Sequence, residues 1–224
     1  MGGVQMEKDD CRLMAEYRSA MYALAAEAFA AEPSDARLRQ MIDLAVDSGP
    51  DDCGRASERD LLRNLSGYAG KDVVALGASI RTEFAELFIG PRRPLAPYYE
   101  SAYVGHPKRM FTQTTKAVRE FYKSFGVEVE KKNAVPDDLL AYELAFMSEL
   151  CRREACEQDK DGVGIERWRT AQLEFLENHL GLWVEPFAEK VEMAWCADWY
   201  AAWARFLRDF TEEDIAYLGT FERL

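Results

Sequence analysis

Side chains able to take part in chemistry gather in one short stretch of this chain, soon after Gly90. The stretch carries phenols, a carboxylate and a hydroxyl, on Tyr98, Tyr99, Glu100, Ser101 and Tyr103. Three prolines at three-residue spacing precede them, Pro91, Pro94 and Pro97. Each proline fixes its own φ and biases the preceding residue toward extended backbone, so we expect a stiff, non-helical loop over residues 90–107. Such a loop is either a recognition surface held by a rigid scaffold or a helix connector whose tyrosines pack on the core.

Nucleophilic catalysis has little support in the sequence. Ser101 and His106 lie close along the chain, but a serine nucleophile also needs an oriented base and oxyanion donors. Neither His106 nor His179 belongs to a metal-binding helix motif, and the chain has no glycine-rich phosphate cradle and no nucleophile elbow. We therefore expect a protein that is not an enzyme. The alternative is a small hydrolase or nucleotide-binding protein that uses Ser101, His106 and the acidic residues around position 138.

Three carboxylates follow Pro136 at short spacing, on Asp137, Asp138 and Glu143. Asp138 suits the positive end of a helix dipole, or a charged contact to a bound peptide. His179 lies near a helix C-terminus, where we expect it to act as a structural cap. The cysteines are five in number, with no C-x-x-C pair, so we expect neither a disulfide framework nor a metal site, and no cofactor.

The composition is typical of an acidic cytoplasmic protein. Its 224 residues are 48% hydrophobic, enough for a sizeable core, and carry a net charge of −12. An acidic surface repels phosphate backbones, so we expect no nucleic-acid partner and, for any charged partner, a basic one. No apolar run approaches the roughly 20 residues of a membrane span, and the start MGGVQMEKDD lacks the pattern of a secretory signal. We therefore expect a cytoplasmic location without stable membrane insertion.

Helical patterns fill the sequence on both sides of the proline loop. Apolar residues recur at helical spacing within 13–28, 38–45, 61–65, 76–87, 118–125, 136–157 and 168–180. Ser34 or Asp35, and Ser57, suit helix N-caps. Pro186 is expected to open a long helix through Asp209 with Trp195 on its core face.

These patterns predict an all-α fold, with a single compact domain of about nine helices over residues 1–224. Gly181 ends one of the expected helices, and Thr211 with Asp214 starts a short last one. We expect residues 1–9 to be disordered and residues 159–164 to form a mobile loop. The oligomeric state is expected to be a monomer or a homodimer.

Three sequence blocks resemble the TorD/DmsD family, whose members are cytoplasmic chaperones for the assembly of molybdenum-containing oxidoreductases. The first block is LFIGPRRPLAPYYESAY, from Leu87 to Tyr103. The second is PDDLL from Pro136 to Leu140, followed by ELAFM from Glu143 to Met147. The third runs from Phe175 to Phe187 and includes His179. The blocks occur in family order and cover about the C-terminal two thirds of the chain.

The resemblance implies a function as well as an all-helical fold. Family members bind the twin-arginine leader of a redox enzyme precursor, which has paired arginines and an apolar segment. A receptor for it needs carboxylates for the guanidinium groups and an apolar groove. The implied partner is the precursor of a molybdopterin oxidoreductase catalytic subunit, held until cofactor insertion and export. The alternative is a helical interaction or regulatory subunit that binds a folded partner.

The family's functional positions carry over residue by residue. The implied leader-binding residues are Tyr99, Glu100, Ser101, Tyr103 and Asp138. Ser101, Tyr103 and Asp138 match the family residues directly, and Tyr99 stands where some relatives have tryptophan.

Other positions depart from the family pattern. Glu100 replaces a glycine, Leu139 a histidine and Val135 a glutamate. These departures predict a divergent member with a client of its own.

Overall fold

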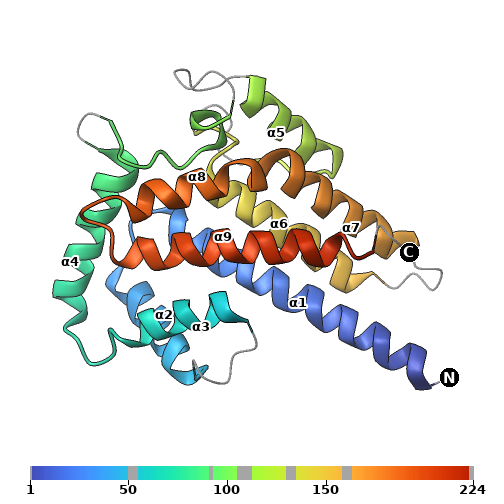
Figure 1. Cartoon of the computed structure of the whole chain (residues 1–224), viewed down its shortest axis with the longest axis horizontal. Helices are drawn as coiled ribbons and strands as arrows, with labels where there is room; N and C mark the ends of the chain where they lie inside the picture. The colour runs from blue at the N-terminus through green and yellow to red at the C-terminus, as the bar shows by residue number, and fades with distance from the viewer. Residues whose placement is uncertain are drawn as a thin grey trace. The chain divides into compact units, whose positions relative to one another are not determined.

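Helices make up most of the described chain. The computed structural model describes residues 2–49, 55–90, 93–104, 113–129, 135–157 and 163–221. Its α-helices are α1 (Gly2–Ala30), α2 (Asp35–Asp47), α3 (Ala56–Ser66), α4 (Val73–Phe84), α5 (Gln113–Ser124), α6 (Leu140–Cys156), α7 (Val163–Phe175), α8 (Gly181–Glu192) and α9 (Trp199–Leu218) (Figure 1). Two π-helical turns, η1 (Ala85–Ile89) and η3 (Leu176–Leu180), and one 3₁₀ turn, η2 (Glu100–Ala102), complete the set.

The all-α prediction is confirmed, since the described residues hold these helices and no strand. They form two compact units. The first unit comprises residues 1–30, 99–182 and 214–224, and the second comprises residues 31–98 and 183–213. The organisation as a single domain stays a prediction, as does disorder in residues 1–9, although α1 is assigned from Gly2. The expected loop at 159–164 lies mostly outside the described residues.

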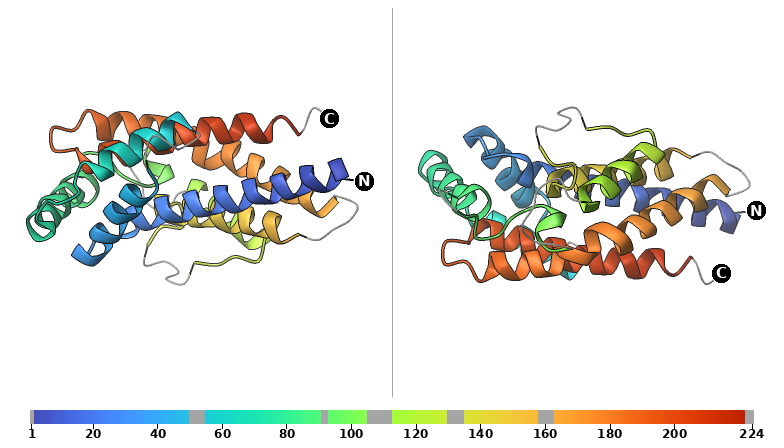
Figure 2. Two further views of the ribbon diagram at one scale, coloured as in Figure 1. Left: turned by 90° about the horizontal axis from the view of Figure 1, so that it is seen from below. Right: turned by 90° about the horizontal axis from the view of Figure 1, so that it is seen from above.

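The first unit is built around α1 and α6, which lie side by side, with α7 against α6 (Figures 1 and 2). Ser19 and Ser148 mark the close approach of α1 and α6, because the hydroxyl of each donates to the backbone carbonyl of the other at 2.9 Å. The apolar face of α1 is made largely of small residues that permit this approach, together with two aromatic rings: Ala15, Tyr22, Ala25, Ala26 and Phe29.

The second unit contains α2 packed on α3 and α4. The predicted core face of α2 is confirmed, because Leu38, Met41, Ile42 and Ala45 are all buried. Ser34 caps α2, as expected, by accepting a hydrogen bond from the backbone N–H of Arg37 at 3.2 Å. The predicted cap at Ser57 is wrong: α3 begins at Ala56, and the N-cap position is Arg55, without a side-chain cap.

An aromatic cluster continues from α4 into η1 and the proline loop. Phe88 stacks on Tyr98 with ring centroids 5.1 Å apart, and it meets Phe84 and Tyr200 edge to face. Gly90 ends η1 with a positive φ of 64°, and a Cβ there would lie 3.0 Å from backbone atoms of Arg93 and Pro94. Only glycine fits this sharp turn without strain. Residues 91, 92 and 105–107 of the predicted loop lie outside the described residues.

The C-terminal helices differ from the prediction. Pro186 does not open a helix but lies inside α8, and Gly181 begins α8 rather than ending the preceding helix. Trp195 lies between α8 and α9 and is 84% exposed, so its predicted place in the core is wrong. Thr211 is within α9 and starts no new helix.

The start of α9 is fixed by a residue that is distant in the sequence. The carboxylate of Glu83, on α4, accepts hydrogen bonds from the backbone N–H groups of Asp198, Trp199 and Tyr200. These groups have no partner within the helix itself, so an acceptor from outside stabilises the helix start. Burial raises the pKa of Glu83, and its backbone hydrogen bonds oppose that rise.

Candidate functional site

The second half of the proline loop is attached to the residues that precede α6. Tyr99 and Leu139 form an isolated antiparallel bridge. The backbone N–H of Glu100 donates to the carbonyl of Asp138 at 2.9 Å, and that of Ser101 donates to Asp138 Oδ2 at 2.8 Å. Two of the sequence blocks singled out as functional are thus brought into direct contact.

Asp138 has a different local role from the one predicted. Helix α6 begins at Leu140, so Asp137 and Asp138 lie before the helix and not in its first turn. The Asp137 carboxylate pairs with Arg119 at 2.6 Å, and its carbonyl accepts from the Tyr122 hydroxyl at 3.2 Å. Asp138 instead binds the loop with one carboxylate oxygen, while the structure gives the other, Oδ1, no hydrogen-bond partner among the described residues.

Glu100 lies in an acidic cluster inside the first unit. The residue is 1% exposed, and His179 Nδ1 lies 3.2 Å from Glu100 Oε2. Burial raises the pKa of Glu100, the charge of Asp138 raises it further, and the contact with His179 acts in the opposite direction. The carboxyl group of Glu143 acts in the same direction as His179 and lowers the pKa of Glu100.

His179 belongs to this cluster, although the sequence suggested only a helix cap. It lies in η3, and its ring packs between Phe121 and Phe175, with centroid separations of 5.7 and 5.1 Å. Glu100 is separated from it by 79 positions in the chain. The third family-like sequence block contains His179, and that block was the available signal for its importance.

The five predicted site residues are close together but differ in access to solvent. Glu100, Ser101 and Asp138 are buried, whereas Tyr99 and Tyr103 are half-buried. The Ser101 hydroxyl has no hydrogen-bond partner among the described residues. Burial raises the pKa of Tyr103, so its phenol stays protonated at neutral pH. The tyrosines can therefore touch a ligand directly, while the three buried residues shape the loop.

Other predicted features are less informative here. His106, the partner suggested for Ser101, lies outside the described residues. Within the described ranges, no group of three or more His, Cys, Asp or Glu side chains is arranged to hold a metal ion. No helix in that part of the chain is long and apolar enough to cross a membrane.

Comparison with known proteins identifies the family of this chain. A family model described as nitrate reductase delta subunit matches residues 54–189, more than half of the chain. The chain therefore belongs to this family. Its resemblance to the TorD chaperones is confirmed, since it is 30% identical over 140 residues to the chaperone protein TorD of Vibrio parahaemolyticus. That alignment covers 62% of this chain and 64% of the relative, so it spans less than two thirds of the relative's length.

Two further comparisons agree with this placement. The chlorate reductase assembly chaperone protein of Ideonella dechloratans is 27% identical over 147 residues, which cover 65% of this chain and 74% of that protein. A crystal structure from Archaeoglobus fulgidus, of a protein named for redox enzyme maturation, matches with a TM-score of 0.51 and 22% identity. It covers 89% of this chain and 94% of that one, which shows a shared fold.

Proposed function

We propose that this protein is a cytoplasmic, non-enzymatic assembly chaperone for the catalytic subunit of a molybdopterin oxidoreductase. It binds the twin-arginine leader of the precursor and holds the apo subunit until its cofactor is inserted and export can follow. The observation that carries the proposal is family membership, together with similarity to proteins named as a TorD chaperone and as a reductase assembly chaperone.

The loop on Asp138 is the proposed leader-binding site. Tyr99 and Tyr103 are its contact residues, because their rings are only half-buried. Glu100, Ser101 and Asp138 hold the loop in place through their hydrogen bonds at the residues that precede α6. The excess of carboxyl groups in this cluster makes the local potential negative, which favours the approach of a basic peptide to this part of the first unit.

Calorimetric titration with leader peptides tests the proposal. The probes are the leaders of twin-arginine oxidoreductase precursors encoded in the same genome, each paired with a version in which the two arginines are replaced by glutamine. Micromolar or tighter binding to one leader, lost in its paired version, is the expected result. Failure of every leader to bind the wild-type protein would refute leader recognition.

One surface favours a second candidate, a helical subunit that binds a folded partner. Met193 and Trp195, in the turn between α8 and α9, are 85% and 84% exposed. Exposed tryptophans are frequent anchors of protein–protein interfaces. Binding to a partner subunit that persists after removal of its leader, and falls on Trp195→Ala, would favour this candidate.

A further inference from the structure

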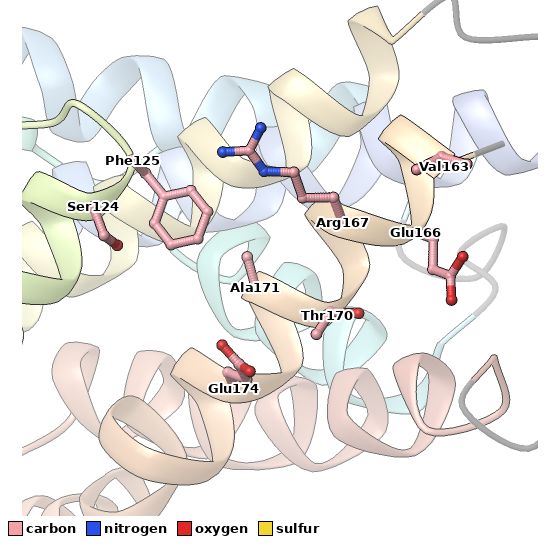
Figure 3. Close-up of a pocket in the computed structure, with 8 residues that line it drawn as sticks. All are labelled: Ser124, Phe125, Val163, Glu166, Arg167, Thr170, Ala171 and Glu174. Carbon is pink, nitrogen blue, oxygen red and sulfur yellow. The ribbon is translucent and has the colours of Figure 1, made fainter.

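A groove in the first unit lies along α7, next to the end of α5. It encloses about 450 Å³ and is lined by Phe125, Val163, Glu166, Arg167, Thr170 and Glu174, among others. Figure 3 shows side chains from the end of α5 and from α7 on either side of it. All of these residues lie outside the sequence blocks that suggested the leader site. We propose that this groove holds the basic, arginine-bearing part of the leader, an inference that rests on the proposed function.

The charge of the groove selects a basic ligand. Glu166, Thr170 and Glu174 follow one another at four-residue spacing, so they share one face of α7. The two glutamates are separated by about 12 Å along the helix axis, from 1.5 Å of rise per residue. Both are exposed, and neither forms an ion pair or hydrogen bond through its side chain with a described residue. The single cation of the lining, Arg167, lies over the ring of Trp168, at 5.1 Å from its centroid.

The same groove offers an apolar surface between these charges. Val163 is 66% exposed and contributes an accessible aliphatic side chain to the groove lining. Phe125 is half-buried and packs on Phe121 and Trp168, with ring centroids 5.4 and 6.0 Å away. A ligand that combines basic groups with an apolar side chain satisfies both features. The twin-arginine leader has this composition, whereas an acidic or purely apolar segment does not.

The groove is physically connected to the loop site. The ring of Phe121 contacts Phe125 at one end and the ring of His179 at the other. His179 in turn contacts Glu100, whose neighbours Tyr99 and Ser101 are tied to the start of α6. Helix α7 continues into η3, so Glu174 and His179 are only five residues apart on one continuous helical segment. A leader seated on the tyrosine loop therefore reaches the groove without leaving the first unit.

The test is a titration of the leader that binds the wild-type protein against matched charge variants. The groove variant is Glu166→Gln with Glu174→Gln. Its control is Glu189→Gln with Glu212→Gln, which removes the same charge from exposed positions of the second unit that do not line the groove. We expect the groove variant to bind about tenfold more weakly, with a shallower salt dependence, because two charge-assisted contacts are lost. The control should bind within about twofold of the wild type, since exposed charges outside the contact surface are largely screened.

Val163→Lys provides a second variant that leaves both carboxylates in place. A cation at this exposed position repels the leader arginines and should also weaken binding, without changing the melting temperature. Wild-type affinity in both groove variants would overturn the inference while leaving leader recognition established. Absence of leader binding by the wild-type protein would instead overturn the proposed function, and this inference with it.

Discussion

Arg18 and Glu100 are both buried ionisable residues of the first unit, but their surroundings are balanced very differently. Arg18 on α1 pairs with Asp214 through two hydrogen bonds and with Glu154 at 3.1 Å, and Gln172 accepts a further bond. Around Glu100 lie two more acids, Asp138 and Glu143, and the basic group that the described residues place against it is the imidazole of His179.

The two regions also differ in how completely their buried polar groups are hydrogen-bonded. In the Arg18 network, Asp214 also accepts from the Tyr22 hydroxyl at 2.8 Å, and Glu154 also accepts from Arg169. In the Glu100 cluster, Asp138 Oδ1 and the Ser101 hydroxyl have no partner within the described residues. A balanced, satisfied network stabilises a fold, whereas buried polar groups without partners call for a functional explanation. The contrast supports a structural role for the first region and a binding role for the second.

The largest expected effect comes from breaking the Arg18 network. Asp214→Asn removes one of the two carboxylates that pair with the buried guanidinium of Arg18. The free energy of unfolding should therefore fall by about 3–5 kcal/mol. Urea denaturation followed by circular dichroism measures this loss. A loss below about 1 kcal/mol would mean that the network is not what holds α1, α6 and the end of α9 together.

Asp138→Asn is the matched change in the other cluster. The Asn side-chain oxygen can still accept from the Ser101 N–H, and a charge next to Glu100 is removed. The free energy of unfolding should therefore change by about 1 kcal/mol or less, while affinity for the leader falls. Denaturation and leader titration on the same preparation separate the two effects. If Asp138→Asn destabilises the protein as much as Asp214→Asn, the distinction between the two clusters is wrong.

The acidic cluster should also make the stability of the protein depend on pH. Burial raises the pKa of Glu100 above its ordinary value of 4.5, so the folded state binds this proton more tightly than the unfolded state. The stabilisation is complete below pH 4.5 and is lost as the pH rises through the folded-state pKa. Glu100→Gln removes the contribution of Glu100 to the pH dependence. The free energy of unfolding of this variant should therefore decline less than that of the wild type between acid and neutral pH. Parallel stability curves for the two proteins would contradict the raised pKa.

The smallest effect is expected at Trp195, which belongs to neither cluster. Because its side chain is 84% exposed, Trp195→Ala should change the free energy of unfolding by no more than about 0.5 kcal/mol. Leader affinity should also be unchanged if recognition takes place at the loop and groove of the first unit. A large fall in leader affinity for this variant would move the recognition surface to the turn between α8 and α9.

Local patterns in the sequence predicted the helices well. The buried face of α2 and its cap at Ser34 follow from residues within one or two turns of each other. Contacts between distant segments were not accessible in this way. Glu83 caps a helix that starts more than a hundred residues later, so the break before Trp199 could not be seen locally. Trp195 was therefore assigned to a continuous helix that does not exist.

The candidate site shows the same limit. Tyr99, Glu100, Ser101, Tyr103 and Asp138 were named together from sequence, and the structure places them together, although their role in leader binding stays a prediction. The pairing of Glu100 with His179 was missed because it joins residues 79 positions apart. The groove was missed because Glu166 and Glu174 look like ordinary solvated positions until the end of α5 is placed beside them.

The pairing of Arg18 with Asp214 also limits when the first unit can fold during synthesis on the ribosome. The two residues are 196 positions apart, and Arg18 is made first. At roughly 5–20 residues per second, the ribosome needs about 10–40 seconds to add the partner. Throughout that interval the first helix lacks Asp214, the acid that accepts two hydrogen bonds from its buried guanidinium. The first unit therefore cannot complete its Arg18 network until residue 214 has been added to the chain.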